Sequence, residues 1–158
     1  MKLGTFIVIA VLLFWGGFGQ AQHWDQAQAG LWSVVEQSWV DDAGETGKWP
    51  GDYVHEKVIG WGSDFPVPRG KDSLEKWTRF DDATSQILEY ELFPHAVVVE
   101  GDTGVVHYSV VTVTEGKEGK TVRQVDGVME TLHRSDGTWR FISTGFFVIR
   151  RSGDSESP

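Results

Sequence analysis

The chain has 158 residues, 40% of them hydrophobic, and its eight Trp and nine Phe supply enough apolar material for the core of one domain. Its 23 acidic side chains outnumber its 14 basic ones and give a net charge of −9, which argues against nucleic acid and anionic membranes as partners. The absence of Cys excludes disulfides and thiolate metal sites, so stability must come from packing.

The first 21 residues have the pattern of a secretory signal peptide. Lys2 precedes an apolar run at residues 6–15, and the small residue Ala21 ends the segment. The apolar run is shorter than the ~20 residues that a membrane-spanning helix needs, so cleavage is favoured over an uncleaved anchor. We therefore expect residues 1–21 to be removed. The mature protein would then start at Gln22 and be secreted or periplasmic, with no stable membrane anchor after processing.

Two helices are predicted in the first half of the chain. The first should begin at Asp25, which forms a capping-box pattern with Gln28, and end at Asp41-Asp42. Its apolar residues recur at helical spacing: Ala27, Leu31, Val34, Val35 and Trp39. A short strand is expected at residues 58–61. A second helix should follow, capped by Asp72 with Glu75, and its shared apolar face would consist of Leu74, Trp77 and Phe80.

The last third alternates apolar and polar residues from Ile87 to Val148. The alternation is cut by polar, Gly-rich turns at residues 100–104, 115–119 and 136–137. Four long strands joined by hairpins predict an α+β fold in which a strongly curved antiparallel sheet forms a cone around the N-terminal helices. Such a cone encloses a pocket. We expect one domain over residues 22–150 and a disordered tail at 151–158.

Three short motifs resemble a known superfamily. They are Pro68-Arg69-Gly70 before the second long helix, Gly101-Asp102-Thr103-Gly104-Val105-Val106 opening a strand, and Asp136-Gly137-Thr138-Trp139 at the last hairpin. In this order the chain resembles the nuclear transport factor 2-like superfamily, specifically its SnoaL-like branch, over roughly Asp25 to Val148. The resemblance implies a cone-shaped, cystatin-like fold and frequent dimers formed through the sheet. The superfamily includes isomerases, dehydratases, polyketide cyclases and proteins with no known reaction, so fold alone does not decide function.

Strand parity selects the candidate pocket residues. If the hairpin at Asp136-Gly137 has an even loop, one face of the preceding strand looks toward the helices together with Trp139 and Phe141. The residues on that face are Gln124, Asp126, Val128, Glu130 and Leu132. Asp126, in mid-strand, is the predicted catalytic general base, since desolvation there raises a carboxyl pKa, and its placement resembles the acidic residue of cyclases in this branch. Gln124 and Glu130 are predicted to bind substrate.

Two alternatives remain open for this face. A bulge would reverse the parity and turn Asp126 and Glu130 toward solvent or a dimer partner. Glu130 lies nearer the hairpin and would have a structural role if it forms an ion pair with an Arg.

Tyr108 and His107 are adjacent on the preceding strand, so only one of them faces the pocket. A five-residue loop at 115–119 places Tyr108 opposite Asp126, whereas a four-residue loop turns His107 inward instead. Tyr108 is a predicted substrate-binding residue because its hydroxyl could polarise a carbonyl beside the Asp. A buried Tyr with a satisfied hydroxyl is the ordinary structural alternative.

Trp61 and Trp77 are predicted to line the mouth of the cone, where a flat or hydrophobic ligand would contact them. No metal or cofactor is expected. His55-Glu56 begins like a zinc-protease motif, but Ile59 occupies the position of the second His.

These patterns predict an exported domain that binds a small, largely apolar molecule. Asp126 would perform acid–base chemistry of the isomerase, cyclase or lyase type. The alternatives are a non-catalytic ligand-binding or accessory dimerisation module, and a cone filled by its own aromatic side chains. A homodimer is expected because the other face of the sheet should expose apolar residues, namely Val125, Met129, Thr131, Ile142 and Phe146.

Overall fold

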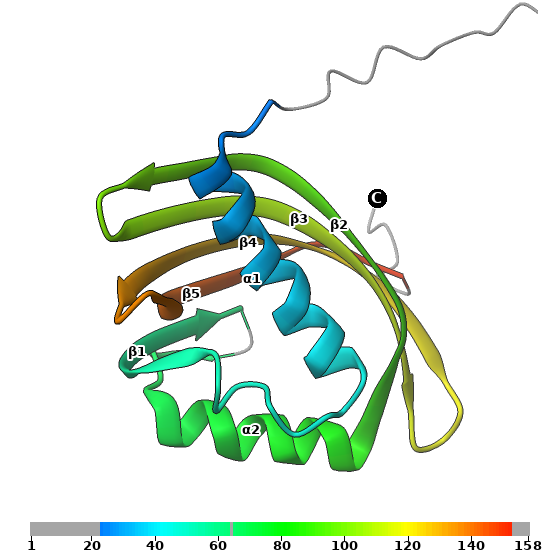
Figure 1. Ribbon diagram of the computed structural model, residues 1–158. Helices are drawn as coiled ribbons and strands as arrows, with labels where there is room; N and C mark the ends of the chain where they lie inside the picture. The colour runs from blue at the N-terminus through cyan, green and yellow to red at the C-terminus, as the bar shows by residue number, and fades with distance from the viewer. Residues whose placement is uncertain (1–22, 64, 153–158) are drawn as a thin grey trace, which may run out of the picture.

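The computed structural model describes residues 23–63 and 65–152, in which two helices lie on the concave side of a five-stranded curved sheet (Figure 1). The helices are α1 (Gln26–Ala43) and α2 (Lys71–Thr84). The strands are β1 (Val54–Gly62), β2 (Ser85–Glu100), β3 (Thr103–Gly116), β4 (Thr121–Ser135) and β5 (Thr138–Arg151). The predicted signal peptide lies outside the described residues. No helix of the described part is long and apolar enough to cross a membrane.

The strand order is β1-β5-β4-β3-β2. The four long strands pair antiparallel through three successive hairpins, as the sequence predicts. The strand predicted at residues 58–61 is longer and runs parallel to β5, with Gly60 opposite Thr144. The α+β prediction of a curved sheet wrapped around helices is thereby confirmed, with a parallel strand added at one edge.

Helix α1 begins where the capping box predicts. The Gln28 amide donates to the Asp25 carboxylate at 2.9 Å, and the Asp25 amide donates to the Gln28 side chain at 3.0 Å. Leu31 and Val35 are fully buried against the sheet. Leu31 fits because β3 has Gly104 beneath it, where an added Cβ would lie 2.4 Å from a Leu31 methyl carbon. The apolar stripe of α1 and the concave sheet face together form the core.

Helix α2 covers the open end of the sheet and buries none of its residues completely. Its N-cap is Gly70, which makes no side-chain hydrogen bond, and Asp72 lies in the first turn. The predicted cap at Asp72 is therefore wrong. The helix approaches β1 closely at Gly60, where an added Cβ would lie 2.9 Å from a Leu74 methyl carbon. A glycine at this point lets α2 close the cone.

Strand β5 contains a bulge that changes which of its side chains face inward. Phe141 pairs with Leu132, but the next pair is Ser143 with Thr131, so Ile142 is an extra residue. Beyond it Phe146 pairs with Val128 and lines the interior. Its predicted place on the outer face is therefore wrong. The bulge lies in β5 and leaves the inward parity of β4 unchanged.

The hairpin between β3 and β4 resolves the choice between Tyr108 and His107. Glu115 pairs with Thr121, giving a five-residue loop displaced by one position from the predicted one. Tyr108 therefore lies opposite Val128, with Asp126 two positions further along the same face. Tyr108 is buried, and His107 is exposed on the outer face.

Strand β5 also runs further than predicted. Arg151 is its last residue and donates from Nε to the Gln124 side-chain oxygen at 2.5 Å. The Ser152 amide donates to the Arg123 carbonyl at 2.8 Å. The sheet thus extends past the domain boundary predicted at residue 150, and residues 153–158 lie outside the described part.

Candidate functional site

A cavity of about 430 Å³ lies between the two helices and the concave face of the sheet. Its polar wall is made by side chains from α1, α2, β3, β4 and β5, and its mouth is aromatic. The predicted site residues that line it are Gln124, Asp126, Glu130, Trp61 and Trp77. Their functional roles remain predictions. Tyr108 lies behind the wall, because it is buried and absent from the lining.

Glu130 is the most unusual residue of the cavity. It lies in mid-β4 between Val106 and Thr144, with only 3% of its surface exposed. Its Oε2 atom has no hydrogen-bond partner. Burial raises the pKa of Glu130 to about 8, although a hydrogen bond from Tyr108 opposes the shift. The carboxyl is therefore mostly protonated at neutral pH. Its hydrogen-bond partner is Tyr108 and not the Arg that the structural alternative required.

Tyr108 connects Glu130 to helix α1. The Trp39 indole Nε1 donates to the Tyr108 hydroxyl at 2.9 Å, and Trp32 packs edge-on against the phenol ring. Burial, followed by the charge of Glu130, raises the Tyr108 pKa well above its ordinary value. The hydroxyl consequently keeps its proton and donates it in the hydrogen bond to Glu130. Tyr108 thus positions one Glu130 oxygen, and the other, Oε2, has no hydrogen-bond partner.

Asp42, in the last turn of α1, is a second carboxyl with a raised pKa. Burial, followed by the charges of Asp82 and Asp81 in α2, raises the pKa of Asp42 to about 7. Asp42 also acts on the Tyr108 hydroxyl through its charge. Asp42 and Glu130 therefore face the same region from opposite sides of the cavity.

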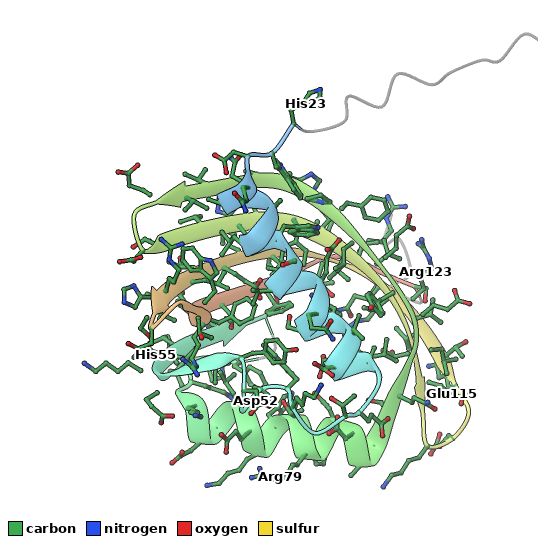
Figure 2. The ribbon with its side chains drawn as sticks, viewed as in Figure 1. His23, Asp52, His55, Arg79, Glu115 and Arg123 are labelled. Carbon is green, nitrogen blue, oxygen red and sulfur yellow. The ribbon has the colours of Figure 1, made fainter. Side chains whose placement is uncertain are left out.

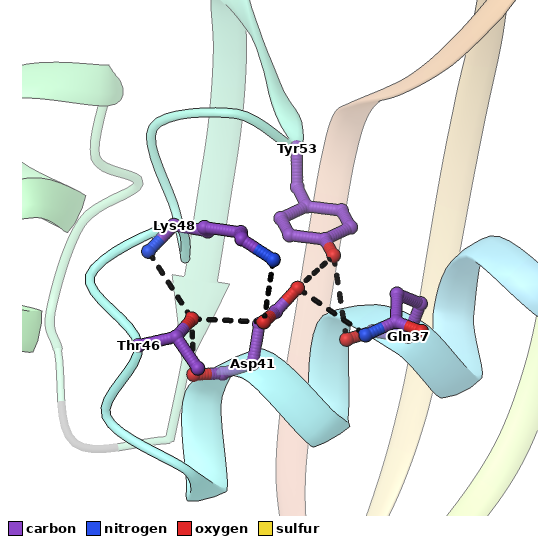
Figure 3. Close-up of polar contacts among 5 residues, drawn as sticks. All are labelled: Gln37, Asp41, Thr46, Lys48 and Tyr53. Carbon is purple, nitrogen blue, oxygen red and sulfur yellow. Dashed lines mark hydrogen bonds and ion pairs between the residues drawn. The ribbon is translucent and has the colours of Figure 1, made fainter.

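Asp41, the neighbour of Asp42 in sequence, has the opposite environment (Figure 3). Its carboxylate accepts hydrogen bonds from the Tyr53 hydroxyl and from Thr46 Oγ1, and Lys48 Nζ lies 3.3 Å away. The bond from Tyr53, followed by the one from Thr46, lowers the Asp41 pKa to about 2. This ionised carboxylate ties the end of α1 to the following loop. It has a structural role, and Asp42 is left to face the cavity.

Asp126 lies on the cavity side, where strand parity places it, and is 7% exposed. Gln124 Nε2 donates to both carboxylate oxygens at 2.8 Å. Gln124 is itself held by Arg151, so the three side chains form a connected polar group at one end of the cavity. The carboxylate of Asp126 is thus stabilised by a donor, whereas Glu130 keeps an unpartnered oxygen.

The cavity mouth is built by the aromatic residues between β1 and α2. Trp61 is 55% exposed and donates from Nε1 to the Phe65 carbonyl at 2.9 Å. Trp77 meets the Phe65 ring edge-on at 4.9 Å. The Arg69 guanidinium lies 3.1 Å from the Phe65 ring centroid and 5.2 Å from that of Trp77. The mouth therefore already accommodates a cation over its aromatic faces.

Within residues 23–63 and 65–152, no three His, Cys, Asp or Glu side chains are grouped so that they could hold a metal ion. The site is thus described by its carboxyl groups, its aromatic residues and one buried phenol.

Comparisons with known proteins identify the fold. No protein-family model and no curated sequence matches this chain. A ketosteroid isomerase-like protein from Erwinia carotovora atroseptica is 15% identical, with a TM-score of 0.72 over 80% of this chain and 99% of that one. A nuclear transport factor 2-like protein from Cytophaga hutchinsonii is 11% identical, with a TM-score of 0.66 over 80% and 100%.

An uncharacterised protein with a cystatin-like fold from Caulobacter vibrioides is 10% identical, with a TM-score of 0.60 over 80% of this chain and 92% of that one. The chain therefore has an α+β cone fold. More particularly, it has the nuclear transport factor 2-like fold that the motifs predict. Its assignment to the SnoaL-like branch remains a prediction.

Proposed function

We propose that the protein binds a small, largely apolar molecule in this cavity and acts on it by proton transfer, in the manner of an isomerase or lyase. The observation that carries the proposal is Glu130, a fully buried carboxyl that lines a ligand-sized cavity and whose Oε2 atom has no hydrogen-bond partner. A neutral carboxylic acid in such a place can donate a hydrogen bond or a proton to a substrate oxygen.

Asp42 and Glu130 divide the acid and base roles in this proposal. The pKa of Asp42 is raised to about 7, so a large fraction is ionised at neutral pH and can accept a proton. The pKa of Glu130 is raised to about 8, so it mostly holds one. Tyr108 acts as a positioning residue, because its hydrogen bond fixes the carboxyl plane of Glu130. Asp126, the predicted general base, stays a second candidate for the base.

The comparison with a ketosteroid isomerase-like protein supports this proposal at the level of fold. The lining adds support of its own, because the aromatic and aliphatic side chains around the carboxyls exclude water and strengthen electrostatic interactions. The apolar lining residues are Trp39, Trp49, Leu74, Ile87, Phe146 and Val148.

The proposed chemistry is tested with an apolar ketone that exchanges carbon-bound protons. The wild-type protein should accelerate deuterium exchange at the α-carbons of 2-tetralone in D₂O, measured by proton NMR. Glu130→Gln should reduce the acceleration by roughly 10²-fold or more, since removal of a general acid or base typically has that effect. Glu118→Gln, at an exposed position in the β3–β4 turn, is the matched control and should not change the rate.

If the deuterium-exchange rate of 2-tetralone is the same with and without the protein, the protein does not catalyse proton transfer on ketones of this class. The non-catalytic binding module would then be the favoured function. A Glu130→Gln rate equal to that of wild type would remove Glu130 from the mechanism. Loss of activity in Asp126→Asn, with Asp42→Asn unaffected, would assign the base to Asp126.

We also propose that two copies pair through the convex face of the sheet. That face exposes large apolar side chains: Phe93, Val98, Met129, Phe147 and Ile149. An exposed apolar surface of this kind is typical of an interface. Sedimentation equilibrium should show a dimer at micromolar concentration, and Met129→Lys should weaken it. A monomeric wild type would contradict the proposal.

Export completes the proposed function. The signal-peptide pattern of residues 1–21 predicts a mature chain that begins at Gln22 outside the cytoplasm. N-terminal sequencing of the protein from its native host checks this, and an intact Met1 would contradict it.

A further inference from the structure

Arg69 is the only basic residue among the described residues that line the cavity. It lies two residues before the start of α2, and its side chain is half-buried. Within the part of the chain that the structure describes, its guanidinium takes part in no hydrogen bond or ion pair. All five N–H donors of the group are therefore left to solvent or to a ligand.

Aromatic stacking fixes the Arg69 guanidinium without using those donors. The group lies 3.1 Å from the ring centroid of Phe65 and 5.2 Å from that of Trp77. The backbone is fixed as well, because the Arg69 amide donates to the Gly60 carbonyl at 2.7 Å and the Gly60 amide donates to the Arg69 carbonyl at 2.7 Å. A guanidinium stacked on a ring keeps the donors at its edge accessible. A ligand that binds these donors therefore loses little affinity to ordering of the side chain.

Acidic side chains line the same cavity, but four of them add little negative charge at Arg69. Asp81 and Asp82 lie in the last turn of α2, at the far end of a 14-residue helix and thus roughly 20 Å along its axis from Arg69. Burial and neighbouring charges raise the pKa of Asp42 to about 7, and burial raises that of Glu130 to about 8. At about pH 6 both carboxyls are mostly protonated, so an anion at Arg69 meets little repulsion from them.

The surroundings of Arg69 select the kind of anion. A single guanidinium, with no second basic residue in the described lining, matches a singly charged group better than a phosphate. The planar fork of the guanidinium binds a carboxylate through two parallel hydrogen bonds. The rings of Trp61, Phe65 and Trp77 around it suit an apolar body attached to that carboxylate.

We propose that the ligand of this cavity is an apolar carboxylic acid, whose carboxylate is bound by the Arg69 guanidinium at the aromatic mouth while its apolar body lies between the helices and the sheet. This inference rests on the proposed function in that it uses the same cavity and specifies the charge of the ligand. Arg69 would then orient the molecule by one end.

Three probes that share a naphthalene ring test the charge preference: 2-naphthoate, its neutral isostere 2-naphthamide, and 2-naphthyl phosphate. Isothermal titration calorimetry at about pH 6 should show that the carboxylate binds at least about tenfold more tightly than the amide, and more tightly than the phosphate. The preference over the amide should shrink as salt is raised from about 0.02 to 0.5 M, because salt screens a half-exposed ionic contact.

Arg69→Gln should weaken 2-naphthoate binding by about tenfold and change 2-naphthamide binding by at most about twofold. Arg69→Lys keeps the charge but loses the planar fork, so it should retain only part of the affinity. Arg79→Gln is the matched control, because Arg79 is exposed on α2 and points away from the sheet (Figure 2). It changes the net charge by the same amount and should bind all three probes like wild type.

Phe65→Leu removes the ring on which the guanidinium lies and leaves the charge of Arg69 in place. It should weaken 2-naphthoate binding by about threefold, since Arg69 is then less well positioned. Circular dichroism and urea unfolding check that each variant folds. If Arg69→Gln does not fold, Arg69→Lys and the comparison of probes on wild type decide the question.

Equal affinity for 2-naphthoate and 2-naphthamide would overturn the inference, as would binding of none of the three probes. Tighter binding of the phosphate would overturn the choice of a carboxylate. A loss of 2-naphthoate affinity that is equal in Arg69→Gln and Arg79→Gln would show an effect of net charge only, and would overturn the site. The 2-tetralone exchange assay uses a neutral probe and measures proton transfer, so the proposed function can fail while carboxylate binding stands, or the reverse.

Discussion

Glu130 should make the stability of the protein fall as pH rises. Its pKa is raised by burial from 4.5 to about 8, so between these values the folded state holds a proton that the unfolded state has lost. Unfolding then releases that proton, and the free energy of unfolding decreases by about 1.4 kcal/mol per pH unit. Over the whole interval this single group should remove roughly 4 to 5 kcal/mol.

Glu130→Gln tests this directly, because the amide keeps the size of the side chain and an oxygen for Tyr108 while removing the titration. Urea unfolding at several pH values between about 5 and 9 should show a shallower loss of stability in the variant. The residual slope should reflect Asp42, whose pKa is also raised. Glu118→Gln should follow wild type. Parallel curves for wild type and Glu130→Gln would show that Glu130 is ionised at neutral pH, and would refute the assignment of its acid role.

Three further substitutions test the packing. Phe141→Ala should lower the free energy of unfolding by about 3 to 5 kcal/mol, since Phe141 is fully buried. A decrease below about 1 kcal/mol, measured by urea denaturation, would contradict the place of Phe141 in the core. Gly30→Ala should raise it by roughly 0.5 to 1 kcal/mol, because an added Cβ there meets nothing within 4 Å and alanine favours the helix; thermal melting would reveal a wrong sign. Gly104→Ala should lower it by about 1 to 3 kcal/mol, because the new methyl group would overlap Leu31, and Leu31→Ala in the same chain should offset part of the clash.

The sequence predicts most of the architecture because alternation and turn residues act locally. The polar turns at 100–104, 115–119 and 136–137 separate strands that do pair as hairpins. The capping box at Asp25 marks the true start of α1. The cap predicted at Asp72 fails for a local reason as well, since Gly70 already ends the preceding extended segment and the helix begins one residue later.

The bulge at Ile142 could not be predicted in the same way. The pattern of apolar and polar residues in β5 is compatible with a strand that has the extra residue and with one that lacks it. Only the packing of Phe141 and Phe146 on the same concave face requires the bulge. This is why Phe146 was expected on the outer face while Asp126 and Glu130 were placed on the correct one.

Strand parity could identify both acids of β4, yet it could not rank them. Asp126 and Glu130 share a face. They differ in their hydrogen-bond partners, which strand parity does not determine. Gln124 folds back to donate two hydrogen bonds to Asp126, whereas Glu130 has only Tyr108. Asp42, Asp81 and Asp82 did carry a usable signal, since acidic residues at the C-terminal ends of helices oppose the helix dipole.

The carboxyl groups of the cavity are difficult to explain as parts of a core selected for stability alone. A buried carboxyl with an unpartnered oxygen is destabilising, and an apolar side chain of similar volume at Glu130 would avoid both desolvation and the missing hydrogen bond. Asp41, next to Asp42 in the sequence, is a stabilising carboxylate by contrast, because it accepts hydrogen bonds from Tyr53 and Thr46. Glu130 accepts a single such bond, from Tyr108, and its Oε2 atom has none. Because Glu130 and Asp42 both line the cavity, the ligand proposed for it would account for their placement.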